Sequence, residues 1–192
     1  PRVSLLQGNP EDIFRIVKVN LLSHFWTLRV FLPDMIAKGS GHIVALGSAI
    51  GYESTGRAIC YSATKFGIRG LMDGLYDLFR IDNIMLNVTT VVPPLVNTRK
   101  EFIAKFIAND GLNAAAELFF YTPEMVAAAT VDGILKNKKY VVLPPLLTTA
   151  LTIANLLPEE LQDLIRENFK PNVQPELNEP EKIQSFASTY LN

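Results

Sequence analysis

Residues 48–65 read SAIGYESTGRAICYSATK, and this stretch decides how the rest of the chain is interpreted. Tyr61 and Lys65 are four residues apart, so on a helix their side chains lie on the same face. A phenol has a pKa of about 10, but a nearby cation favours its phenolate form. Ser48 closes the apolar run HIVALGS, which predicts a buried strand, and open α/β sheets bind ligands at the carboxyl ends of their strands. The stretch therefore predicts a ligand-binding hydroxyl beside a pair that can transfer a proton.

The same region resembles a known catalytic sequence. Residues 41–52, GHIVALGSAIGY, and 61–79, YSATKFGIRGLMDGLYDLF, resemble the catalytic segment of the short-chain dehydrogenase/reductase family. The resemblance implies that Ser48 holds the substrate oxygen and that Tyr61 transfers the proton. It also implies that Lys65 binds the ribose of a nicotinamide cofactor, NAD or NADP, and lowers the pKa of Tyr61. Without the resemblance, a tyrosine and lysine at this spacing are common by chance and often have no function.

Asn20 lies among the apolar positions of a predicted helix, where a buried amide needs hydrogen-bond partners. From the residues alone it is a satisfied core amide or an exposed side chain. Its segment, VNLLSHFWT at residues 19–27, is similar to the family segment in which an asparagine distorts the helix and holds a water connecting to the lysine. The resemblance therefore adds Asn20 to the candidate catalytic residues Ser48, Tyr61 and Lys65.

A second informative stretch, PPLVNTR at residues 93–99, follows a predicted strand. It resembles the family's turn that contacts the nicotinamide end of the cofactor, which implies cofactor contacts at Pro93, Val96 and Thr98. Pro94 departs from the family pattern, and because proline has no N–H, any backbone hydrogen bond from that position is lost. Without the resemblance, the stretch is a simple Pro-Pro loop.

The order of predicted elements indicates an α/β fold, a Rossmann-like doubly wound parallel sheet. We expect residues 1–170 to form the C-terminal part of one such domain and residues 171–192 to be a flexible polar tail. No glycine-rich phosphate turn precedes Ser48, and the chain does not begin with methionine. We therefore expect a piece of a longer protein that lacks the N-terminal cofactor-binding strands and is inactive on its own.

The predicted elements follow from hydrophobic periodicity and turn residues. They are a long helix from Pro10, with a bend near Pro33; a strand at 42–47; a loop at 49–57; a helix carrying Tyr61 to about Arg80; a strand at 84–92; a helical segment at 100–121 that resembles the family's substrate-binding cover; a helix capped by Thr122; and a short strand in KKYVVLP, residues 138–144.

Composition argues against several kinds of partner and site. The 192 residues are 48% hydrophobic and carry a net charge of -1, which argues against nucleic acid as a partner because phosphate binding needs a clustered basic surface. The single cysteine, Cys60, permits no internal disulfide and is predicted to be a buried apolar residue. His24 and His42 have no partners at metal-ligand spacing, so no metal site is predicted.

Within the family, residues 24–44 and the YVVLPPLL segment at 140–147 most resemble the membrane- and lipid-droplet-associated branch with 17-beta-hydroxysteroid and retinol dehydrogenases. The resemblance implies interconversion of a lipophilic alcohol (steroid, retinoid or fatty alcohol) and its ketone or aldehyde. It also implies a homodimer at the endoplasmic reticulum membrane or a lipid droplet; otherwise a cytoplasmic location is expected. The uncharged segment 140–157 is too short to span a membrane and predicts an interfacial, partner-facing or packed terminal helix.

Two other classes of function remain open. The chain could be a noncatalytic scaffold or lipid-surface protein that retains the fold, and such a protein would fold without binding a dinucleotide. It could also be an epimerase or dehydratase, because a Tyr/Lys pair serves those reactions on related folds. In that case the cofactor would stay bound and show no net redox change.

Overall fold

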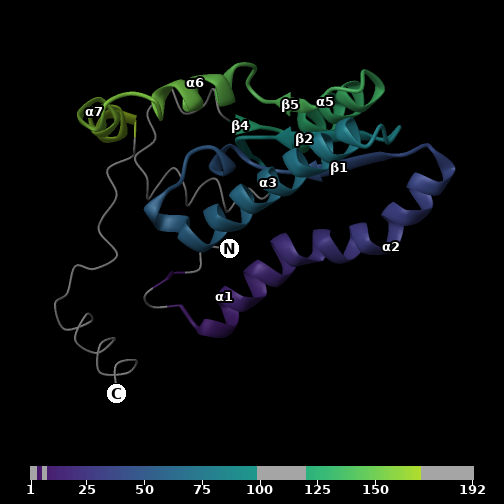
Figure 1. Ribbon diagram of the computed structural model, residues 1–192. Helices are drawn as coiled ribbons and strands as arrows, with labels where there is room; N and C mark the ends of the chain where they lie inside the picture. The colour runs from purple at the N-terminus through teal and green to yellow at the C-terminus, as the bar shows by residue number, and fades with distance from the viewer. Residues whose placement is uncertain (1–3, 6–7, 99–119, 170–192) are drawn as a thin grey trace.

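The computed structural model describes residues 4–5, 8–98 and 120–169, in which helices and short strands alternate along the chain (Figure 1). The elements are α1 Pro10–Val17, a π-helical turn η1 Lys18–Leu22, α2 Ser23–Lys38, β1 His42–Leu46, α3 Ile59–Ile81, β2 Asn87–Val92, β3 Leu95–Val96, β4 Phe120–Tyr121, α5 Pro123–Leu135, β5 Tyr140–Val142, α6 Leu147–Ala154 and α7 Glu159–Phe169. Two short 3₁₀ turns, Ala49–Gly51 and Gly56–Ala58, lie between β1 and α3.

Local sequence explains where the helices begin and end. The Asn9 side chain accepts a hydrogen bond from the Glu11 amide at 3.0 Å and so caps α1. Thr122 does the same for α5, accepting from the Met125 amide at 3.2 Å. Gly39 ends α2 in the left-handed conformation, with φ of 65°, which glycine adopts without a steric penalty. The predicted cap of α5, Thr122, is confirmed.

The main sheet is parallel, in the order β1-β2-β5. β1 pairs with β2 from His42↔Asn87 to Leu46↔Val91, and β2 pairs with β5 from Thr90↔Tyr140 to Val92↔Val142. A second, two-stranded sheet joins β3 and β4, also in parallel. The predicted parallel α/β architecture is confirmed.

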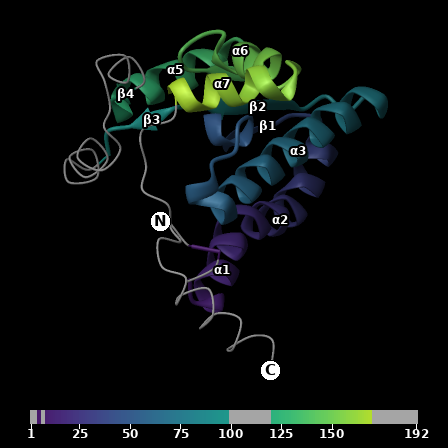
Figure 2. The same ribbon diagram turned by 90° about the vertical axis from the view of Figure 1, so that its left-hand side faces the viewer.

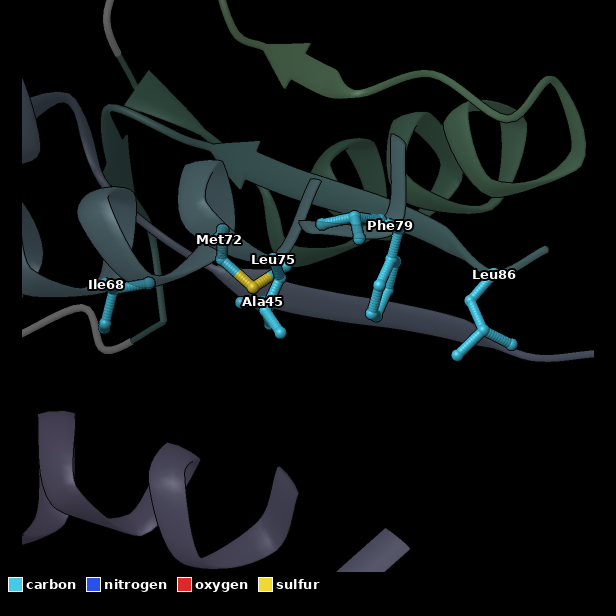
Figure 3. Close-up of a cluster of buried hydrophobic side chains, with 7 residues drawn as sticks. Ala45, Ile68, Met72, Leu75, Phe79 and Leu86 are labelled. Atoms are coloured by element: carbon cyan, nitrogen blue, oxygen red, sulfur yellow. The ribbon is translucent and has the colours of Figure 1, made fainter. Parts of the chain in front are cut away.

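Helices cover both faces of the sheet. Figures 1 and 2 show α2 and α3 on one side of the strands and α5 on the other. The larger core lies on the α3 side (Figure 3) and contains Ala45, Ile68, Met72, Leu75, Phe79, Leu86 and Val88, with Leu28 and Leu32 of α2 packed against it. The smaller core lies under α5 and contains Val91, Val126 and Val141. Side chains therefore alternate between the two faces along β2, as the strand pleat requires.

β1 is the uncovered end of this sheet. Val44 and Leu46 point away from the α3 core, and 38% and 58% of their surfaces are exposed. The strand is paired on one side only, with β2. Among the described residues, no helix covers this face of β1. An apolar, unpaired strand is a surface on which chains tend to associate.

Several predicted boundaries were wrong. The strand expected at 84–92 begins at Asn87, because the preceding residues turn after Asn83, whose φ of 53° is left-handed. The loop expected at 49–57 contains the two 3₁₀ turns. Pro33 lies inside α2, which continues to Lys38, and the bend near it stays a prediction. Residues 120–121 form a strand instead of a helix, and α7 was not predicted.

Two predicted segments lie mostly outside the described residues. They are the cover segment at 100–121, of which only β4 is described, and the tail at 171–192. Among the described helices, none combines the length and the apolar character that crossing a membrane requires.

Candidate active site

Ser48 sits immediately beyond the carboxyl end of β1, where its backbone is extended and its side chain is buried. Its hydroxyl oxygen accepts a hydrogen bond from the Ile50 amide at 3.3 Å and so caps the 3₁₀ turn that follows. The Ala49 amide donates to the Pro93 carbonyl at 3.1 Å, which ties this turn to the end of β2. The predicted position of Ser48 at a strand end is therefore confirmed.

Tyr61 and Lys65 lie one turn apart at the start of α3 and converge on the same region. The Lys65 Nζ atom lies 5.5 Å from the centre of the Tyr61 ring. It donates a hydrogen bond to the Leu46 carbonyl at 2.8 Å, two residues before Ser48. The Ser48 hydroxyl lies close enough to the Tyr61 phenol to affect the pKa of that phenol. The structure thus brings the three predicted residues together at the end of β1.

Glycine permits the close approach between the Ser48 turn and α3. A Cβ atom added at Gly51 would meet the Lys65 carbonyl oxygen at 2.9 Å, which is closer than real Cβ contacts come. Because that oxygen belongs to the helix backbone, it cannot move aside as a flexible side chain could. Gly51 therefore keeps the turn that follows Ser48 against the helix that carries Tyr61 and Lys65.

Burial dominates the electrostatics of this pair. Burial raises the pKa of the Tyr61 phenol above its usual value, with a smaller opposing effect of the Ser48 hydroxyl. Burial also lowers the pKa of the Lys65 ammonium. In this structure burial of the phenol is the larger effect on the pKa of Tyr61 and the Lys65 ammonium bonds the Leu46 carbonyl, so the lowering of that pKa by Lys65 stays a prediction.

Asn20 lies in the middle of the π-helical turn η1, so the predicted local distortion of this helix is confirmed. The Asn20 amide donates to the Thr64 hydroxyl at 3.3 Å, and Thr64 donates to the Tyr61 carbonyl at 2.7 Å. Asn20 therefore contacts the residue before Lys65, and its water-mediated link to Lys65 remains a prediction. The Ser23 hydroxyl donates back to the Val19 carbonyl at 2.7 Å, a bond of the kind that bends helices.

His24 follows η1 and faces the same region. Its Nε2 atom is buried and has no hydrogen-bond partner within the described part of the chain. Burial lowers the pKa of the His24 imidazole, and the positive charge of Lys65 lowers it further. No metal site was predicted at His24, and its position near Lys65 was not predicted either.

The turn after β2 holds the three predicted cofactor contacts. Pro93 and Val96 are half-buried, Thr98 is exposed, and Val96 packs against the core under α5. The Asn97 amide donates to the Tyr121 carbonyl at 2.8 Å and the Thr98 amide to the Val96 carbonyl at 2.8 Å. Because these amides are already bonded and Pro94 has none, the exposed side chains of Asn97 and Thr98 are polar groups that this turn can offer a ligand.

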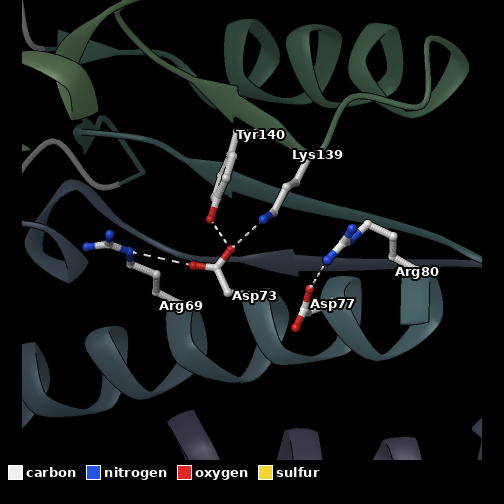
Figure 4. Close-up of polar contacts among 6 residues, drawn as sticks. All are labelled: Arg69, Asp73, Asp77, Arg80, Lys139 and Tyr140. Atoms are coloured by element: carbon white, nitrogen blue, oxygen red, sulfur yellow. Dashed lines mark hydrogen bonds and ion pairs between the residues drawn. The ribbon is translucent and has the colours of Figure 1, made fainter. Parts of the chain in front are cut away.

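Residues that sequence reasoning missed lie further along α3. Asp73 contacts Arg69, Lys139 and Tyr140 (Figure 4). The Arg69 guanidinium also lies 4.0 Å from the centre of the Tyr52 ring. Arg69 and Asp73 continue the four-residue spacing of Tyr61 and Lys65. That spacing is the signal in the sequence that could have found them.

Comparison with known proteins agrees with this arrangement. A family model described as short chain dehydrogenase matches residues 2–102. Human 17-beta-hydroxysteroid dehydrogenase 13 is 30% identical over 181 residues, which are 94% of this chain and 57% of the relative. Human estradiol 17-beta-dehydrogenase 11 is 31% identical over 163 residues, 84% of this chain and 51% of the relative. The chain spans about half the length of the relatives it matches.

Solved structures match at the level of the fold. A short chain dehydrogenase/reductase from Burkholderia phymatum in complex with NAD has a TM-score of 0.62 at 18% identity, covering 92% of this chain and 68% of that one. A short-chain dehydrogenase from Sphingobium yanoikuyae in complex with NADPH has a TM-score of 0.63 at 18% identity, covering 94% and 64%.

The fold and the site together define a class of protein: a parallel α/β sheet with a serine, a tyrosine and a lysine gathered at one strand end. Within that class, the chain belongs to the short chain dehydrogenase family. Its relatives include steroid dehydrogenases by name.

Proposed function

We propose that this chain supplies the proton-transfer half of a nicotinamide-dependent oxidoreductase that interconverts a lipophilic alcohol and its ketone or aldehyde. The observation that carries the proposal is the convergence of Ser48, Tyr61 and Lys65 at the end of β1, where the Lys65 ammonium bonds the Leu46 carbonyl at 2.8 Å and lies 5.5 Å from the centre of the Tyr61 ring. Two relatives are named as steroid dehydrogenases, which supports a lipophilic substrate.

In the proposed reaction, the Ser48 hydroxyl holds the substrate oxygen and the Tyr61 phenol exchanges a proton with that oxygen. Because burial raises the pKa of Tyr61, the phenol is protonated at neutral pH and ready to donate to a carbonyl. Lys65 brings a positive charge within 5.5 Å of the phenol ring. A hydrogen bond from Ser48 stabilises the negative charge that develops on the substrate oxygen.

The residues around Lys65 fit the ribose of a nicotinamide cofactor, NAD or NADP. The turn after β2 fits the nicotinamide end less well, because Pro94 has no amide N–H to donate. The Lys65 ammonium can donate hydrogen bonds to ribose hydroxyls, and it reaches the carboxyl end of the parallel strand β1. Across the site, Pro93, Val96 and Thr98 would contact the nicotinamide end, with the Thr98 hydroxyl as the donor. Such a group would supply or accept the hydride.

The substrate class is tested with the protein produced from its complete coding sequence. We expect turnover of secondary steroid alcohols, retinoids or long-chain alcohols, and little turnover of small polar alcohols at equal concentration. Preferential turnover of polar polyols would contradict the lipophilic assignment. A bound dinucleotide with no net redox change would instead favour an epimerase or dehydratase, and folding without dinucleotide binding would favour a noncatalytic scaffold.

The outer face of α3 supports a homodimer. Its side chains Phe66, Leu78 and Ile81 are 40%, 42% and 63% exposed. Between them, Gly70 and Gly74 leave open space where a Cβ atom would stand. An apolar stripe interrupted by glycines lets two helices approach closely, so we propose that a second copy packs here.

The dimer is tested by light scattering after gel filtration. We expect Leu78→Glu to convert the dimer to a monomer, because it places a charge in the proposed interface. Leu135→Glu is the control, since Leu135 lies on α5 and is 79% exposed. A parent chain that is monomeric at high concentration, or a Leu78→Glu variant that stays dimeric, would contradict the interface.

The region of α6 and α7 supports contact with a membrane or lipid-droplet surface, with the endoplasmic reticulum and lipid droplets as the proposed locations. Leu146, Ile153 and Leu156 are 75%, 57% and 80% exposed, and residues 140–158 carry no charge. Glu159 and Glu160 open α7, which disfavours anionic headgroups and favours a neutral lipid surface.

This proposal is tested by flotation with zwitterionic vesicles and with neutral oil droplets. We expect the parent chain to float with them and Leu156→Glu to reduce the bound fraction, whereas Leu135→Glu should not. Binding that requires anionic lipid, or that survives Leu156→Glu unchanged, would contradict the proposed surface.

A further inference from the structure

A polar network joins α3 to the start of β5 (Figure 4). Asp73 lies at its centre: its carboxylate is 3.0 Å from Lys139 Nζ and 3.8 Å from Arg69 Nε, and it accepts a hydrogen bond from the Tyr140 hydroxyl. The charged side chains of this network are 34–37% exposed, so they are partly shielded from water. A partly buried group of several charges contributes more than a single exposed ion pair.

The network extends to the turn that follows Ser48. The Tyr52 side chain is buried, is in hydrogen-bonding contact with Tyr140, and lies under the Arg69 guanidinium. Tyr140 donates its hydroxyl proton to Asp73, so its contact with the Tyr52 hydroxyl links Tyr52 to that carboxylate. Tyr52 is therefore connected to Asp73 along two routes, through Arg69 and through Tyr140.

The backbone around Tyr52 completes the connection to Ser48. The Gly51 amide donates to the Ser48 carbonyl at 2.9 Å, and the Tyr52 amide donates to the Ala49 carbonyl at 2.9 Å. On the other side, the Tyr52 carbonyl accepts from the Asn155 side chain at 3.0 Å. A displacement of the Tyr52 ring would therefore be passed to the turn that Ser48 caps.

We propose that Tyr52 and Asp73 are positioning residues: the network between them holds the turn that carries Ser48 against α3, so that Ser48 and Tyr61 meet at one substrate oxygen. The inference rests on the proposed function. Its geometric basis is that Tyr61, Lys65, Arg69 and Asp73 follow one another at four-residue intervals along one helix, and so share a stripe of its surface. The first two residues meet the end of β1, and the last two anchor the turn.

The first test is hydrogen exchange at the Gly51 and Tyr52 amides, measured by NMR on this chain. In Asp73→Asn, which keeps the shape but removes the charge, we expect these amides to exchange about tenfold faster than in the parent. Asp77→Asn is the matched control, because Asp77 lies one turn further along α3 and pairs only with the exposed Arg80 among the described residues. Its Gly51 and Tyr52 amides should exchange at the parent rate.

Tyr52→Phe provides a second variant, because it removes the bond to Tyr140 and keeps the ring under Arg69. It should accelerate the same amides and, through the weakened Ser48 contact, shift the NMR signal of the Tyr61 hydroxyl-bearing carbon. If Asp73→Asn does not fold, Tyr52→Phe decides the question alone. Parent exchange rates and an unmoved Tyr61 signal in the folded variants would overturn the inference.

The second test uses turnover by the protein produced from its complete coding sequence. We expect kcat to fall about tenfold in Asp73→Asn, with the KM for the nucleotide within about twofold of the parent, because misplaced groups weaken the transition state more than binding. Unchanged kcat alongside faster exchange would overturn the positioning role. A parent protein without turnover would reject the proposed function, while the exchange experiment would still decide whether the network orders the turn.

Discussion

Tyr61→Phe is expected to abolish turnover while leaving the fold intact. Phenylalanine keeps the ring in its pocket but removes the hydroxyl that contacts Ser48, so no group remains to exchange a proton with the substrate oxygen. Loss of a positioned acid or base typically costs about 10²- to 10⁴-fold in rate. The measurement is the initial rate of cofactor oxidation or reduction by the protein produced from its complete coding sequence.

A matched control lies on the same helix. Tyr76 is 40% exposed, and its ring lies 4.1 Å from Lys139 Nζ, a contact that phenylalanine preserves. Tyr76→Phe should therefore retain full turnover. Circular dichroism and thermal unfolding of both variants should match the parent. Turnover by Tyr61→Phe within about threefold of the parent would reject its assignment as the acid/base, because the smallest expected effect is far larger.

Ile68→Ala is expected to lower the free energy of unfolding by about 2–5 kcal/mol, the range for large-to-small changes in packed cores. Ile68 is 1% exposed and lies in the larger core, between α3 and the sheet (Figure 3). Removing its side-chain carbons leaves a cavity lined by neighbours from α2, α3 and the strands. Urea unfolding monitored by circular dichroism measures the change.

Leu135→Ala is the control for this prediction. Leu135 is the last residue of α5, lies outside the proposed dimer interface and is 79% exposed, so its replacement should change the free energy of unfolding by less than about 0.5 kcal/mol. Equal effects of the two substitutions would mean that α3 does not pack on the sheet as described. The comparison thus tests the packing that positions Tyr61 and Lys65.

The site residues that the sequence predicted are those whose spacing is local. Tyr61 and Lys65 share a helix face, and Ser48 ends a recognisable apolar strand, so short-range periodicity was enough to group them. The same holds for the cap Thr122, which bonds an amide three residues away. Such features depend only on residues that are close together in the sequence.

Features that arise from distant parts of the chain could not be predicted in the same way. Asp73 meets Tyr140 across 67 positions, and Asn155 reaches the Tyr52 carbonyl across 103. The raised pKa of Tyr61 likewise results from the neighbours that bury it, and residue spacing carries no measure of that burial. Spacing likewise predicts that Lys65 lies near Tyr61, but not that its ammonium bonds the Leu46 carbonyl.

The strand boundaries failed for a related reason. An apolar run marks where a strand can form, but its paired length depends on its neighbour. β2 begins at Asn87, opposite His42, and the apolar residues before it serve the core instead: Leu86 is buried there and Ile84 packs against it. Periodicity cannot distinguish an apolar residue that pairs in a sheet from one that only packs beneath it.

The central claim is that Ser48, Tyr61 and Lys65 serve a nicotinamide-dependent oxidoreductase. The most direct test follows the absorbance of reduced nicotinamide with NAD and NADP in turn, using the protein produced from its complete coding sequence and a panel of steroids, retinoids and long-chain alcohols. We predict a change in absorbance with one of the two nucleotides that requires substrate and disappears in Tyr61→Phe. A folded protein that neither binds nor converts either nucleotide, or that works equally well without the Tyr61 hydroxyl, would contradict the claim.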